Sequence, residues 1–327
     1  MFKGTKVIDV HGHMSTPPEF RAHISNNVAL NTPSKLELSD ERLDTALKRH
    51  LQVMDERNID LQLIGPRPVA MWHWMRPILQ ENWARVTNDV IAQSVKLHPD
   101  RFVGMAQLPQ SPYEKDTKKC AAELERSVKE LGFVGGYLNP DPGGKKEVPG
   151  VNDEYWYPLY EKAQALDAPL MVHPSASYDL RLEIIPHNYQ INNVTEEYIA
   201  MMLYQHTGVF KDFPRLKVVI CHCGGALQRF IPSDHHTGHH AELHNNLYFD
   251  TCAYDDYFLA AAIEQKGVDQ MVFGTEAPGS GGAIRPDTGR PSDDVVPVID
   301  SLKILSEEDK VKIFNTNPKK VFTLLKA

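Results

Sequence analysis

The segment Val7-Ile8-Asp9-Val10-His11-Gly12-His13 decides the expected fold, because a short apolar run ends directly in two histidines. Side chains two positions apart on a strand point to the same side. His11 and His13 are therefore expected to project together from the end of a first strand. Seven similar apolar runs follow, so the predicted strands are residues 7–10, 61–64, 102–106, 134–138, 170–172, 217–220, 247–249 and 271–273.

Amphipathic stretches separate these runs, which is typical of repeated strand–helix units. The near-continuous hydrophobicity of several runs favours parallel strands covered by helices. We therefore expect an α/β fold, a (β/α)8 TIM barrel, formed by one domain of residues 1–327. Residues 17–39 and 178–193 are interpreted as insertions over its C-terminal mouth, and Ser306 as the N-cap of a last helix. The other predicted helices are residues 40–57, 83–96, 117–131, 155–166, 195–208, 260–267 and 292–302.

Composition excludes several classes of function. The chain has 327 residues, 42% of them hydrophobic, and a net charge of -8, which argues against a nucleic-acid partner because phosphate binding needs a basic face. Its apolar runs are too short to span a membrane, its first residues show no signal region, and its four cysteines are scattered. We expect a cytoplasmic protein that does not enter the membrane.

Ligand-type residues follow three other predicted strands directly: His173, His222 and Glu276. In a barrel of this class the C-terminal strand ends meet in one pocket, where catalytic residues gather. Taken alone, the His-x-His pair could be two polar residues at a turn. Its combination with these three side chains instead predicts one functional site.

Further motifs resemble the amidohydrolase superfamily and, within it, the aminocarboxymuconate semialdehyde decarboxylase family, over nearly the whole chain. The resemblance implies that His11, His13, His173 and Glu276 bind a divalent metal, most simply one Zn²⁺ with Mn²⁺ or iron as alternatives, and that His222 and Glu276 are catalytic. It also implies a homo-oligomer, a dimer or larger. Besides the His-x-His pair, the motifs are Gln107-Leu108-Pro109-Gln110, Leu138-Asn139-Pro140, Phe210-Lys211-Asp212-Phe213-Pro214, His222-Cys223-Gly224-Gly225 and Tyr248-Phe249-Asp250-Thr251.

The eighth predicted strand departs from the family pattern, because Gly274-Thr275-Glu276 has Glu where most members have Asp. This Glu, with Gly65-Pro66-Arg67, Thr288-Gly289-Arg290 and Ser292-Asp293-Asp294, resembles the subgroup of 4-oxalomesaconate hydratase and the zinc meta-cleavage C–C hydrolases. The likeness implies a hydratase or C–C bond hydrolase that acts on an unsaturated oxo-carboxylate from aromatic ring cleavage. The alternatives are a non-oxidative decarboxylase of an aromatic or muconate-type carboxylate, an amide or lactone hydrolase, and a catalytically silent metal-binding barrel.

Four residues are candidates for binding a small-molecule carboxylate substrate. Arg67 and Arg229 could each hold a carboxylate as a bidentate fork. Tyr189 could donate a hydrogen bond to a ketone or enolate oxygen, with Asn188 beside it. Each has a structural alternative, which is a surface ion pair for the arginines and packing for the tyrosine.

Three further features favour structural interpretations. Cys221 and Cys223 flank His222, but alternation along a strand points both thiols away from the histidine, so we expect buried structural cysteines. Trp72, His73 and Trp74 either wall the pocket or only pack. A run of histidines is expected to be a solvated loop: His235, His236, His239, His240 and His244.

Overall fold

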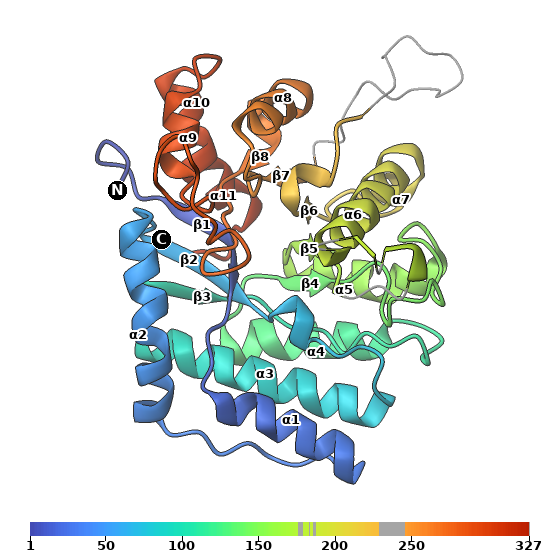
Figure 1. The fold of residues 1–327 in the computed structure, drawn as a ribbon. Helices are drawn as coiled ribbons and strands as arrows, with labels where there is room; N and C mark the ends of the chain where they lie inside the picture. Colours follow the sequence, from blue (N-terminus) through green and yellow to red (C-terminus); the bar gives the residue numbers. More distant parts are fainter. Residues whose placement is uncertain (176–178, 183, 186–187, 229–245, 327) are drawn as a thin grey trace.

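The strands follow the sequence prediction closely. The computed structural model describes residues 1–175, 179–182, 184–185, 188–228 and 246–326 (Figure 1). Every strand pair is parallel, in the orders β1-β2-β3 and β4-β5-β6-β7-β8. The strands in this described part are β1 (Ile8–His13), β2 (Leu61–Gly65), β3 (Phe102–Gly104), β4 (Gly136–Leu138), β5 (Leu170–Val172), β6 (Val218–Ile220), β7 (Leu247–Asp250) and β8 (Met271–Val272).

Backbone contacts bridge the two gaps between these sheets. Ala106, just after β3, pairs in parallel with Gly136 of β4. On the other side, the Val10 amide donates to the Phe273 carbonyl at 2.8 Å, and the Glu276 amide donates to the His11 carbonyl at 2.7 Å. The strands therefore form the α/β barrel that the sequence predicted, and the β8–β1 seam lies directly at the site.

The helices surround the strands (Figure 1). α3 begins at Pro77 rather than at residue 83, because proline is favoured in the first helical turn, where its missing N–H is not needed. α9 begins at Val296 rather than at residue 292. The last helices begin at the predicted cap, where Ser306 and Asp309 form a capping box. The helices are α1 (Pro18–Leu30), α2 (Asp40–Glu56), α3 (Pro77–Leu97), α4 (Lys118–Leu131), α5 (Tyr157–Leu166), α6 (Asn188–His206), α7 (Val209–Asp212), α8 (Asp256–Lys266), α9 (Val296–Ser301), α10 (Glu307–Val311) and α11 (Asn317–Val321).

The insertion at residues 17–39 contains α1, which lies beside α3 (Figure 1). Phe20 of α1 is buried and its ring centroid lies 4.4 Å from that of Trp83 on α3. The second insertion, residues 178–193, falls partly outside the described residues, and α6 begins within it at Asn188.

Among the described helices, none combines the length and the apolar character that a membrane span requires.

Candidate metal centre and active-site cavity

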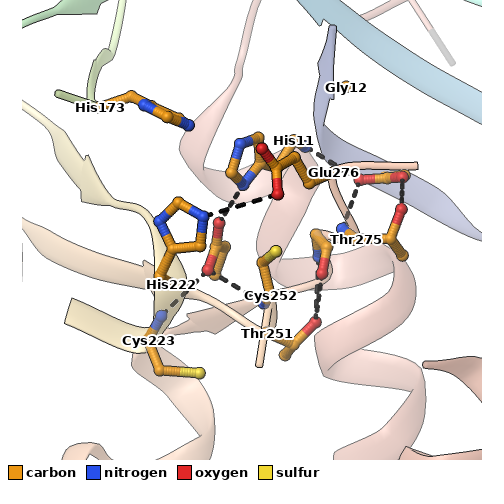
Figure 2. A network of polar contacts seen from close by, with 12 residues as sticks. His11, Gly12, His173, His222, Cys223, Thr251, Cys252, Thr275 and Glu276 are labelled. Carbon is orange, nitrogen blue, oxygen red and sulfur yellow. Dashed lines mark hydrogen bonds and ion pairs between the residues drawn. The ribbon is translucent and has the colours of Figure 1, made fainter. Parts of the chain in front are cut away.

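The strand ends bring His11, His13, His173 and Glu276 together as the sequence predicted. Their ligand atoms all lie within 4.8 Å of one another, and all four residues are buried. The Nε2 atoms of His11 and His13 are 3.3 Å apart, and Glu276 Oε1 lies 3.5 Å from His13 Nε2. Ligands at about 2.1 Å from a tetrahedral metal ion are themselves about 3.4 Å apart. We call these four residues the strand-end cluster, and Figure 2 shows three of them, His11, His173 and Glu276.

Hydrogen bonds on the far side of two imidazoles support metal binding by the cluster. His11 Nδ1 lies 2.7 Å from Asp250 Oδ2, and His173 Nδ1 donates to the Pro174 carbonyl at 2.7 Å. Each bond places the proton on Nδ1 and leaves the Nε2 lone pair for an ion, the usual arrangement for ligating histidines. His173 Nε2 is buried and has no hydrogen-bond partner among the described residues. This donor set fits a divalent cation.

Asp250 and Asp9 hold the strand ends in place from behind. Asp250 Oδ1 accepts from the backbone amides of Cys223 at 3.1 Å and Cys252 at 3.0 Å, so one carboxylate connects β7, the turn after β6 and His11. Asp9 accepts from the His11 amide at 2.9 Å and from the Thr275 hydroxyl at 2.6 Å. Burial raises the pKa of Asp9 to about 6, although hydrogen bonds from Thr275 and other neighbours oppose this.

Glu276 adopts a backbone conformation that aims its side chain across the barrel mouth. Its φ of +61° is left-handed, and Gly274 before it has no room for a side chain, because a Cβ there would lie 2.9 Å from the Cβ atoms of His11 and Asp250. Its Oε2 accepts from the Tyr254 hydroxyl at 2.8 Å and from the Ser280 hydroxyl at 2.7 Å. Burial alone would raise the pKa of Glu276, but hydrogen bonds with His13 and His222 hold it well below its usual value.

His222 faces the cluster from the turn after β6. Its Nδ1 lies 2.8 Å from Oε1 of Glu197. On the other side of the ring, its Nε2 lies 3.8 Å from Glu276 Oε2 (Figure 2). Burial alone would lower the pKa of His222, but the negative charge of Glu197 raises it well above the usual value. Gly225 lets α6 approach, since a Cβ there would lie 2.1 Å from the Val194 carbonyl oxygen. No local pattern pointed to Glu197, because its helix was predicted only as an amphipathic stretch.

A cavity of about 410 Å³ opens beside the cluster. Arg67, the candidate for carboxylate binding, lines it and donates to the carbonyls of Met14 at 3.0 Å and Pro278 at 3.2 Å. Burial lowers the pKa of Arg67, while the charge of Glu276 opposes that shift. The residues with polar groups on this wall include His13, Arg67, His222, Cys252, Tyr254 and Glu276.

Several sequence candidates lie elsewhere. Arg229 and the histidine run fall outside the described residues, as do the side chains of Asn188 and Tyr189, although both residues belong to α6. Trp72, His73 and Trp74 are not among the residues that line the cavity. The two indoles stack at 5.6 Å, and His73 is buried and accepts from the Asn139 amide group at 3.0 Å, so the packing alternative holds.

The cysteines and the residues after β7 complete the site. Cys221 and Cys223 are buried free thiols, as expected, and Cys221 lies near His11 and Asp250. Sequence reasoning missed the roles of Asp250, Cys252 and Tyr254. The sequence does contain a local signal for these residues, because polar residues follow the seventh apolar run just as the histidines follow other apolar runs.

Comparison with known proteins agrees with this geometry. The amidohydrolase family model matches residues 8–324. The chain belongs to the amidohydrolase family. A 2-keto-4-carboxy-3-hexenedioate hydratase from Sphingobium sp. is 35% identical over 98% of this chain and 97% of its own length. The crystal structure of 4-oxalomesaconate hydratase from Rhodopseudomonas palustris matches with a TM-score of 0.81 and 32% identity, covering 97% of this chain and 96% of that one.

The family also contains decarboxylases. A 2-amino-3-carboxymuconate-6-semialdehyde decarboxylase from Dictyostelium discoideum is 25% identical over 82% of this chain and 74% of its own length. The predicted family and its hydratase subgroup are thus confirmed, and the protein is an enzyme of the amidohydrolase superfamily.

Proposed function

We propose that this amidohydrolase is a metal-dependent hydratase that adds water to an unsaturated oxo-carboxylate resembling 2-keto-4-carboxy-3-hexenedioate. The observation that carries the proposal is the pair Glu276 and His222, whose Oε2 and Nε2 atoms lie 3.8 Å apart beside the three-histidine cluster. Two groups that can exchange protons at one cavity suit an addition reaction, which must remove one proton from water and deliver one to carbon. The two hydratase relatives support the same assignment.

The strand-end cluster would hold one divalent ion in this enzyme. Three imidazoles and a carboxylate suit Zn²⁺, and Mn²⁺ is the alternative. Such an ion lowers the pKa of a bound water and polarises a substrate oxygen. The orphaned Nε2 of His173 is the clearest sign that the pocket is built for a cation rather than for a protein hydrogen bond.

The chain's own residues then divide the proton transfers. Glu276 takes a proton from water while the water oxygen bonds to the carbon that is β to the substrate ketone, and the π electrons move onto the ketone oxygen as an enolate. His222, kept protonated by Glu197, delivers its proton to the α carbon, so one water is added and no group leaves. Arg67 uses two of its five N–H donors on carbonyls, and those that remain can hold a substrate carboxylate.

The test is turnover of a conjugated oxo-tricarboxylate by metal-loaded protein. Hydration removes the double bond, so we expect the ultraviolet absorbance of the conjugated ketone to fall and NMR to show a single hydrated product. Glu276→Gln and His222→Asn should each lower kcat by about a hundredfold or more. The exposed Glu130→Gln, which makes the same chemical change far from the cavity, should leave kcat unchanged.

Three other outcomes would each overturn the hydratase assignment. Release of CO2 would favour the decarboxylase alternative, and two fragments would indicate a C–C hydrolase. If the fully metal-loaded protein turned over none of the ring-cleavage acids, the alternative of a catalytically silent metal-binding barrel would be favoured.

We also propose that the enzyme is cytoplasmic and forms a homo-oligomer. Light scattering during size-exclusion chromatography tests the second statement, and a monomer at micromolar concentration would contradict it.

A further inference from the structure

A second cavity of about 640 Å³ adjoins the first one. Arg67 and Val69 line both cavities, so these two residues form the partition between them. The second cavity is built from the chain that follows β1, from the start of α1 and from α3. Its described lining residues are Met14, Ser15, Thr16, Pro17, Pro18, Phe20, Arg21, Ala46, Arg67, Val69, Ala70, Trp83, Thr87 and Gln107.

The described lining of the second cavity is positively charged, although the whole chain has a net charge of -8. The charged lining residues are Arg21 and Arg67, and no acidic side chain belongs to the described lining. Burial lowers the pKa of Arg67, the negative charge of Glu276 opposes that shift, and the positive charge of Arg21 adds to it. Two guanidiniums in the wall of one cavity, whose described lining holds no carboxylate, can together bind a carboxylate of a ligand.

Two buried polar atoms of residues that line the same cavity have no hydrogen-bond partner among the described residues. They are Thr87 Oγ1 and Gln107 Oε1, and each side chain belongs to a residue that is only 1% exposed. A buried polar atom without a partner costs free energy, so such atoms usually mark a place where a ligand or water completes the bonding. The Thr87 hydroxyl can donate to an anionic oxygen, and Gln107 Oε1 can accept from a hydroxyl or water beside it.

We propose that the second cavity binds a carboxylate between Arg21 and Arg67, with the Thr87 hydroxyl as a neutral donor. The rest of the wall is apolar, with Phe20, Trp83 and Met14 among its members, so the ligand carries an apolar body next to its carboxylate. Two sources supply this chemistry: a distal carboxylate of the substrate that reaches past Arg67, or a separate organic acid. The inference does not rest on the hydration reaction, because it concerns binding alone.

Calorimetric titration of the metal-loaded protein with benzoate, a monocarboxylate with an apolar body, tests the site. Arg21→Ala should weaken benzoate binding about tenfold or more, because it removes a charge-assisted hydrogen bond, and Arg21→Lys should weaken it less. Thr87→Val, which keeps the side-chain shape, should weaken binding a few-fold. The matched control is Arg85→Ala, which removes an exposed guanidinium from the same helix as Thr87 but outside the cavity, and should bind benzoate like the wild type.

Two results would overturn the proposal. Wild-type affinity in both Arg21→Ala and Thr87→Val would show that benzoate binds elsewhere, for example at the metal. An equal loss in Arg85→Ala would show a general effect of charge. Thermal unfolding of each variant confirms that the protein is folded, and no substrate turnover is needed for any of these measurements.

A second titration separates the two sources of the carboxylate. Tricarballylate, a saturated tricarboxylate that cannot be hydrated, is added to protein saturated with benzoate. Displacement of benzoate by one tricarballylate supports a single molecule that spans both cavities. Simultaneous binding of both ligands supports a site for a separate acid.

Discussion

The strand-end cluster and the wall of the cavity beside it are held in different ways. His11, His173 and Glu276 are fixed by backbone contacts of the barrel and by buried partners such as Asp250. The wall residues Arg67 and Tyr254 come from segments beyond the strands and are fixed by a few hydrogen bonds each. In the proposed mechanism the reaction chemistry rests on the barrel frame, whereas the groups proposed to recognise substrate lie on segments that can vary without disturbing the frame.

Replacing a ligand of the cluster should have the largest effect. His173→Ala removes the imidazole whose Nε2 has no protein partner. We expect substoichiometric metal after purification and a loss of kcat of about a thousandfold or more, since the ion contributes several kcal/mol to the transition state. Elemental analysis and steady-state kinetics measure both. A His173→Ala protein with full metal and normal kcat would remove the basis for the cluster as a metal site.

Asp250→Asn weakens the frame without removing a ligand. An amide at this position no longer specifies an Nδ1 proton on His11, whose contact with Asp250 is 2.7 Å long. Such partners of ligating histidines typically contribute 10–100-fold in metal affinity, so competition with a chelator should show a weakening of about that size. Unchanged metal affinity would mean that the barrel backbone alone orients His11 and that the contact with Asp250 is not needed for this.

The same contrast explains what the sequence could predict. Apolar runs that end in ligand-type residues identified the eight strands and the members of the cluster, because strand periodicity and barrel topology together fix where such residues meet. The partners Glu197 and Tyr254 were missed. Glu197 reaches His222 only because Gly225 allows α6 to pack closely, and a contact between distant segments leaves no local pattern. Boundaries of α3 and α9 shifted for a similar reason, since tertiary context decides where a helix begins.

A change in the cavity wall should separate turnover from metal binding. Tyr254→Phe removes the hydroxyl that donates to Glu276 Oε2 at 2.8 Å and keeps the ring. We expect kcat to fall about tenfold, because a hydrogen bond to a charged group orients the carboxylate, while metal content stays at the wild-type level. Ser280→Ala should also lower kcat, by a smaller factor, and should leave the metal content unchanged. A fall in metal content in Tyr254→Phe would instead show that Tyr254 helps to hold the metal ligands, as the barrel frame does.

The last prediction concerns the stability of the fold near the cavity wall and not turnover. His73 is buried, and burial lowers its pKa to about 3, against 6.5 for an ordinary histidine. The unfolded chain therefore binds a proton below about pH 6.5 that the folded protein does not bind, so the free energy of unfolding falls as the pH falls from 6.5 toward 3. At about pH 5 this one group should cost about 2 kcal/mol relative to neutral pH.

The variant His73→Gln keeps an acceptor for Asn139, which also donates to Ser175 on the cavity wall. Urea unfolding at about pH 7 and about pH 5 should show a smaller loss of stability for this variant than for the wild type. Other buried histidines, including His50 with a pKa of about 4, contribute equally to both proteins and cancel in the difference. Equal losses in the two proteins would mean that His73 gains a proton within the fold, and the wall would then be more open to water than its burial indicates.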